Sequence, residues 1–272
     1  MSDNIQIPRF VEGRIFYNNS VSEALADVSK SKHKPLYMDE LLAIRSINDK
    51  DSWVWNDWYC APSVRVTGKT KQGKNVVVYG HVPNYFSNPK NISASVSMGL
   101  KNGAGMFGSN PKNAQKEFQK LLDLEDNENV FIVDYDSLKS SVSGVIKVSE
   151  ALKHPQIIPF IGGKEKAEKY LAQHEKVLGN SISVGYRDDL ADEPFGCVLF
   201  ADGRYGGGYI LGYNDLDCSG RFLGVPLVGG ADARKISPLE KMVGKGVDVE
   251  NGIIVTKKED LTPAQYKLFT KP

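Results

Sequence analysis

Residues 88–134 constrain the possible fold of this chain more than any other stretch. Three glycines there have the G-x-G-x-x-G spacing of a dinucleotide-binding fingerprint: Gly103, Gly105 and Gly108. A helix-like segment follows at 113–124, and then an apolar run at 130–133 that ends on Asp134. Glycines, helix, strand and acidic residue stand in the order in which a nucleotide-binding α/β unit binds pyrophosphate and then ribose. One interpretation of the chain is therefore a nicotinamide-dependent oxidoreductase.

The segment before the glycines decides between this interpretation and a loop between two helices. A dinucleotide site needs a buried parallel strand that runs directly into the first glycine. The apolar residues of 92–100 fit both a half-exposed strand and a helix. Asn-Pro pairs at 88–89 and 110–111 favour two helices, because Asn is a good N-cap and Pro suits the first helical position. We therefore expect Gly103 to end the first helix and 103–109 to be a loop, whereas the oxidoreductase depends wholly on a strand at 92–100.

Patterns elsewhere predict a mixed α and β fold. Strand-like runs flank 71–74, and two more flank the Asp202-Gly203 turn, so two hairpins are expected. Further strands are expected at 10–17, 157–161, 222–228 and 253–256, and helices at 20–28, 38–47, 145–153 and 163–178. Residues 53–60, which hold all three tryptophans, fit a strand or a helix. We predict an α+β fold with a central mixed, partly antiparallel sheet that contains two hairpins and is flanked by five or more helices. Residues 1–228 would form the main domain, and 229–272 a glycine-rich linker with a strand and a helix from Thr262 that packs on it.

Composition excludes several classes of protein. Lys and Arg total 34 against 33 Asp and Glu, so the net charge of +1 gives no field that would recruit nucleic acid. The start lacks the features of a secretory signal, and no apolar segment is long enough to cross a bilayer. Three cysteines form an odd set without the spacing of a zinc site. We expect a soluble cytoplasmic protein with no membrane contact, no bound nucleic acid and no metal.

Two glycine-rich segments and a few polar residues are the candidates for a functional site. Backbone N–H groups of consecutive glycines can approach an anion, and Arg204 would add charge to Gly206, Gly207 and Gly208. The alternative is a sharply bent strand that needs small residues. The tryptophan cluster is either a stacking platform or part of the core. The acidic loop at 188–193 is either a divalent cation site or a solvated loop.

Polar residues at the ends of predicted strands are the candidates for catalysis. Asp134 and Asp136 end one apolar strand, where a carboxylate could be a general base or could cap the next turn. His81 follows the strand 76–80 and could be catalytic or structural. The first hypothesis is an enzyme or binder of a small anionic, nucleotide-like or phosphorylated ligand, with these residues and the glycine loops in one pocket. The alternative is a non-catalytic structural, interaction or assembly protein. The sequence does not determine the cofactor or the oligomeric state.

Overall fold

The chain divides into two compact units in a computed structural model that describes residues 4–7, 13–185, 188–203, 209–227, 248–250 and 253–257. The larger unit is Arg14–Val225, and the smaller one combines Met1–Gly13 with Pro226–Pro272. The described strands of the smaller unit are β1 (Asn4–Ile7), β14 (Asp248–Glu250) and β15 (Ile253–Lys257), paired antiparallel in the order β1-β15-β14. The strand predicted at 253–256 is β15, and the helix expected from Thr262 lies outside the described residues.

The larger unit alternates strands and helices. Its strands are β2 (Arg14–Asn18), β3 (His33–Pro35), β4 (Trp58–Lys69), β5 (Asn75–Gly80), β6 (Leu100–Lys101), β7 (Ala104–Met106), β8 (Val130–Asp134), β9 (Gly144–Lys147), β10 (Ser181–Val184), β11 (Phe195–Asp202), β12 (Tyr209–Asn214) and β13 (Gly220–Pro226). Its α-helices are α1 (Val21–Lys30), α2 (Met38–Ser46), α3 (Pro89–Ser97), α4 (Pro111–Leu122), α5 (Tyr135–Lys139), α6 (Val148–Ala151), α7 (Ile157–Ile161) and α8 (Lys164–Leu178). Two short 3-10 helices, η1 (Trp53–Trp55) and η2 (Tyr85–Ser87), precede β4 and α3.

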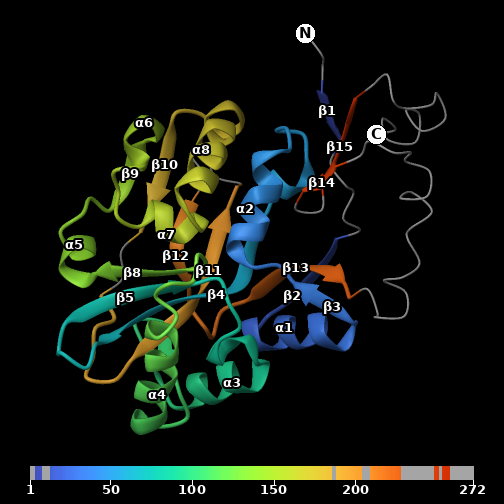
Figure 1. Cartoon of the computed structure of the whole chain (residues 1–272). Coiled ribbons are helices and arrows are strands. Elements are labelled where there is room, and N and C mark those ends of the chain that lie inside the picture. The colour runs from blue at the N-terminus through green and yellow to red at the C-terminus, as the bar shows by residue number, and fades with distance from the viewer. Residues whose placement is uncertain are drawn as a thin grey trace. The chain divides into compact units, whose positions relative to one another are not determined.

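Strand β4 is the centre of the sheet (Figure 1). The main path is β2-β13-β4-β11-β12-β10-β9, and β5 and then β8 extend it from β4. Both predicted hairpins are confirmed, because β4 pairs antiparallel with β5 and β11 with β12. The pairs β13–β4 and β10–β12 are parallel, so the sheet is mixed as expected.

Helices cover both faces of this sheet, which gives the unit two hydrophobic cores. Helices α2, α7 and α8 lie on one side, and α1, α3 and α4 on the other (Figure 1). Residues of β4 from Tyr59 to Gly68 are buried because side chains on both faces meet a core. The α+β class, the mixed sheet and the five or more helices are confirmed. No helix in the described part of the chain has both the length and the apolar character needed to cross a bilayer.

The helix starts predicted from capping residues are correct. Asn88 and Asn110 cap α3 and α4, each with Pro at the first position. Of the two serines at the start of the helix expected at 20–28, Ser20 and Ser22, it is Ser20 that caps α1. The segment 92–100 is thus mainly helix, so the nicotinamide interpretation loses the strand on which it depended. Gly103 does not end α3: Gly99 follows the helix with a φ of 100°, and Gly103 lies in the turn between β6 and β7.

One predicted strand was wrong, and one predicted helix begins later than expected. Residues 157–161 form α7 rather than a strand, because Ile157, Phe160 and Ile161 at helical spacing are buried in the core beside α2 and α8. The helix expected at 145–153 begins only at Val148, because 144–147 form the edge strand β9 paired with β10. Period alone cannot separate a short buried helix from a short buried strand, so tertiary packing decides.

Candidate functional site

The first glycine segment packs closely against a helix and a turn of the same unit. A Cβ on Gly108 would lie 2.3 Å from the backbone nitrogen of Ala114 in α4, and one on Gly105 would lie 2.8 Å from Leu216 Cδ1. Gly103 has a φ of 76° in the β6–β7 turn. Gly105 and Gly108 therefore allow close contact with neighbouring residues, and Gly103 allows a left-handed backbone conformation in the turn. The second group, Arg204 with Gly206, Gly207 and Gly208, lies outside the described residues.

His81 is buried at the end of β5, where it joins several elements. Its Nε2 donates to the carbonyl of Pro159 (2.9 Å), and its Nδ1 lies 3.0 Å from Ser63 Oγ. Asp39 Oδ1 is 3.7 Å from the same Nδ1, and Lys166 Nζ lies 2.8 Å from the other oxygen of Asp39. Burial lowers the pKa of His81, which keeps the ring neutral. The arrangement ties β4, β5, α2 and α7 together.

The structure does not bring His81 and the predicted catalytic aspartates together. Asp134 is opposite Val76 in the β5–β8 pair, whereas His81 follows Gly80 at the other end, roughly 16 Å away at about 3.3 Å per residue. Asp134 caps α5: its Oδ1 accepts from Ser137 N, and its pKa is lowered by this bond and by Lys74. Asp136 is exposed in the first turn of α5. Their catalytic role stays a prediction.

The acidic loop at 188–193 closes over the sheet through a buried ion pair. Asp189 accepts from Arg65 Nη1 (2.6 Å) and from Thr67 Oγ1 (2.7 Å), both on β4. Burial is the largest single influence and lowers the pKa of Arg65, but the combined effects of Asp189, Tyr79 and Cys197 exceed it, so the pKa is raised. Tyr135 Oη also donates to Asp188 (2.7 Å). These contacts attach the loop firmly to the scaffold.

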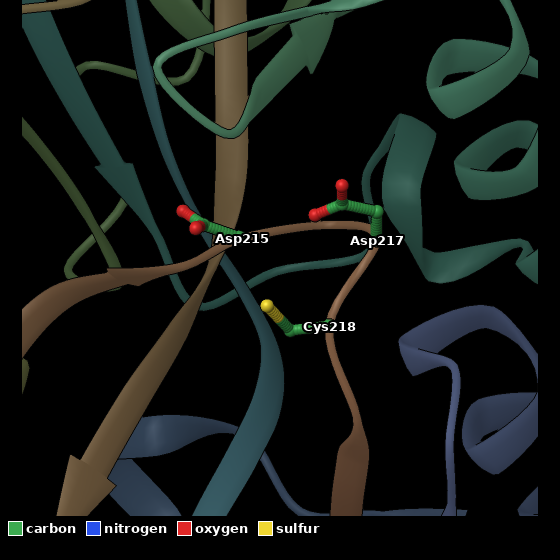
Figure 2. Close-up of side chains that lie close together, drawn as sticks. All are labelled: Asp215, Asp217 and Cys218. Atoms are coloured by element: carbon green, nitrogen blue, oxygen red, sulfur yellow. The ribbon is translucent and has the colours of Figure 1, made fainter.

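One group of three metal-binding residue types occurs among the described residues, in the turn between β12 and β13 (Figure 2). The ligand atoms of Asp215, Asp217 and Cys218 all lie within 4.8 Å of one another. Two carboxylates suit a hard cation and a thiolate suits a soft one, and calcium takes six to eight oxygen ligands. The turn itself is well anchored, because Leu216 N donates to Gly103 O and Val21 N to Cys218 O.

A surface that the sequence did not reveal lies where β2, β4, β11 and β13 meet. We call it the arginine–aromatic surface, and it consists of Ile15, Tyr17, Asp57, Trp58, Phe200 and Arg221. Arg221 lies over the rings of Tyr17 and Trp58, 5.3 Å from each centroid, and it donates to Asp57. Tyr17 is 54% exposed and Ile15 41%. Apolar rings, an aliphatic side chain and a guanidinium are thus presented together.

Buried groups hold this surface in place from below. Arg45, which is completely buried, donates from Nε to Val54 O (2.9 Å) and from Nη2 to Asp57 O (2.8 Å). Gly203 N also donates to Asp57 O, at 3.3 Å, and a Cβ on Gly203 would lie 2.1 Å from Trp55 O. The position of Asp57 therefore depends on Arg45 and on the absence of a side chain at 203.

The surface continues into an open groove along an outer strand. Among the described residues, β2 pairs only with β13, so its other edge borders the groove. The groove has a volume of 390 Å³, and it is lined by Arg14, Ile15, Phe16, Tyr17, Asp27, Lys30 and Ser31. Asp57 neutralises Arg221, whose Nε is buried and has no hydrogen-bond partner among the described residues. The chemistry is that of a binding surface, with apolar area and donors but no nucleophile paired with a base.

Sequence reasoning missed this surface because its members are far apart in the chain. Asp57 and Arg221 are 164 positions apart, and nothing local to either predicts the pair. The exposed alternation of Ile15 and Tyr17 on β2 was the one available sign. The tryptophan cluster divides: Trp55 is core, stacked on Tyr170, whereas Trp58 lies under Arg221.

Comparisons with known proteins give one informative result. No family model matches the sequence, and no curated protein matches it significantly. One solved structure is similar to this chain, and its description is "Accommodation of massive sequence variation in Nanoarchaeota by the C-type lectin fold". Its sequence is 46% identical to this chain, and the two structures superpose with a TM-score of 0.72. The match covers 78% of this chain and 97% of that one.

Proposed function

This chain belongs to the C-type lectin fold family, and we propose that it is a binding domain whose arginine–aromatic surface contacts a protein partner. The observation that carries the proposal is Arg221 stacked over Tyr17 and Trp58 beside the exposed Ile15. Arg and aromatic side chains are enriched at the centres of protein–protein interfaces and carry much of the binding energy there. The partner would place an apolar side chain on Ile15 and Tyr17 and a hydrogen-bond acceptor beside the guanidinium.

The composition of the surface favours a protein partner. Exposed apolar side chains, Ile15 and Tyr17, adjoin an arginine that lies over aromatic rings, and this combination is typical of protein–protein interfaces. The charge of Arg221 is balanced by Asp57, so this surface does not favour the small anionic ligand expected from the sequence. The relative's fold is described as accommodating massive sequence variation. In this chain Tyr17 and Ile15 are exposed, so replacing either by another residue type would change binding with little effect on folding.

Selection from a phage-displayed peptide library tests the proposal without knowledge of the natural partner. We expect enriched peptides to bind the wild-type chain and to lose at least about tenfold in affinity for Tyr17→Ala and for Arg221→Ala, which corresponds to a hot-spot loss of about 1.4 kcal/mol or more. Lys139→Ala is the matched control, because Lys139 is exposed on α5, away from this surface.

Two results would overturn the proposal. Peptides that bind both surface variants as tightly as the wild type would place the binding surface elsewhere. Saturable binding to a glycan array, combined with no peptide enrichment, would replace the protein partner by a carbohydrate.

A further inference from the structure

A second surface of the larger unit concentrates positive charge in a groove. Three lysines of α4 recur every fourth residue on one face of the helix, and Lys71 in the β4–β5 turn lies across from them. The groove has a volume of 470 Å³ and is lined by Lys71, Lys112, Gln115, Lys116, Gln119, Lys120 and Asp123. Gln115 Nε2 donates to Lys69 O at 3.3 Å, which joins the helix to the hairpin and fixes the two walls.

Most of the charge in this groove is not compensated within the described residues. Lys120 pairs with Glu117 (2.8 Å), but Lys71, Lys112 and Lys116 have no ion-pair partner in the described part of the chain. Lysines of the same hairpin that lie outside the groove are paired: Lys69 with Asp192 and Lys74 with Asp134, each at 3.1 Å. Three lysines without an ion-pair partner among the described residues therefore lie together in one hollow of the surface.

The position of the lysines on α4 adds to their mutual repulsion. Lys112 lies in the first turn, which contains no acidic residue, and a helix N-terminus favours anions over cations. Successive lysines four residues apart are separated by about 6 Å along the helix axis. A ligand with several linked negative groups can contact more than one ammonium group at once, and lysine binds phosphate as a point charge.

We propose that this groove binds a ligand that carries two or more linked phosphates, held by Lys71, Lys112 and Lys116. The site is separate from the arginine–aromatic surface, so either can exist without the other. Such a ligand could be a nucleoside triphosphate or an inorganic polyphosphate, which share the phosphate chain. Binding relieves the repulsion among the lysines, so it is expected to weaken as salt screens the charges.

Calorimetric titration of the full chain with tripolyphosphate, ATP and adenosine tests the proposal. We expect saturable binding of tripolyphosphate and ATP, none of adenosine, and a several-fold weakening between 50 and 300 mM NaCl. Equal affinity for the two phosphate ligands would show that the phosphate chain alone is recognised. A tenfold preference for ATP would show that the nucleoside is recognised as well.

Two double variants with the same change in net charge distinguish binding in the groove from non-specific attraction of the phosphate ligand to the positively charged surface. Lys112→Glu/Lys116→Glu is expected to lose at least tenfold in affinity, whereas Lys139→Glu/Lys176→Glu, on exposed positions of α5 and α8, is expected to keep it. The groove variant should unfold thermally at the same or a slightly higher temperature, because acidic residues suit the first turn of α4. No saturable binding by the wild type, or equal loss in both variants, would overturn the proposal.

Discussion

Arg65 and Arg221 lie on strands of the same sheet, and each is paired with an aspartate, yet their surroundings differ. The side chain of Arg65 is 2% exposed and that of Asp189 0%, whereas Arg221 and Asp57 are both 22% exposed. Breaking the first pair would leave a charge stranded in the core. Breaking the second would leave a charge that water can reach. An arginine–aspartate pair thus stabilises the buried scaffold in one place and forms part of an accessible surface in the other.

This difference explains how the fold can keep its shape while a surface changes. The contacts of Arg65, Arg45 and His81 connect strands and helices from below the surface and depend on burial. The exposed residues Ile15 and Tyr17 contribute little to these connections. A binding surface of this kind can be altered at a small cost in folding.

The largest expected effect comes from removing the buried charge partner. Asp189→Asn should lower the free energy of unfolding by about 3–5 kcal/mol, because the charge of Arg65 stays buried without compensation. Urea unfolding measures this change. The control is Asp192→Asn, which removes an exposed partner of Lys69 and should cost at most about 1 kcal/mol. Equal losses in the two variants would mean that burial does not separate scaffold from surface.

A smaller loss is expected where the surface joins the scaffold. Gly203→Ala should destabilise the chain by about 1–3 kcal/mol, because the added Cβ would meet the backbone carbonyl of Trp55. Gly80→Ala is a matched control, since a Cβ there would have ordinary contacts of 3.5 Å or more. If both variants unfold at the same urea concentration, the close approach of residues 203 and 55 is not needed for folding.

The buried histidine gives the scaffold a predicted pH dependence. The folded-state pKa of His81 is lowered, chiefly by burial and despite Asp39, while Lys166 lowers it and Glu40 raises it. Its contribution to stability is therefore present above about pH 6.5 and is lost as the pH falls through the folded pKa. His81→Gln should flatten the fall in melting temperature between pH 7.5 and pH 5.

The control for this measurement is the other histidine whose pKa is lowered. Burial also lowers the pKa of His154, which is partly buried. The variant His154→Gln still contains His81, so its melting temperature should still fall between pH 7.5 and pH 5 by the amount that His81 contributes. An unchanged pH profile in His81→Gln would refute the assignment.

Local features of the sequence predicted much of the fold but not the site. Asn-Pro pairs, a serine cap and turn residues fix helix starts and hairpins within a few residues of the chain, so α1, α3, α4 and both hairpins could be predicted. The helix α7 could not, because five apolar residues lack a distinguishing period.

The functional surfaces depend on contacts between distant positions. Arg65 and Asp189 are 124 residues apart, and their local sequences indicate only a strand and an acidic loop, so the ion pair between them could not be predicted. The lysine groove likewise needs the β4–β5 turn to lie across from α4. The topology of the sheet brings these residues together, and that topology cannot be derived from a single sequence.

The smallest expected effect on stability provides the most direct test of the account. Tyr17→Ala/Arg221→Ala should lower the free energy of urea unfolding by no more than about 1–2 kcal/mol, since both residues are at least partly exposed, yet it should remove at least about nine-tenths of the binding to selected peptides. Measuring both quantities on the same preparation is decisive. A loss of stability as large as that of Asp189→Asn, or peptide binding that survives, would contradict the division between scaffold and binding surface.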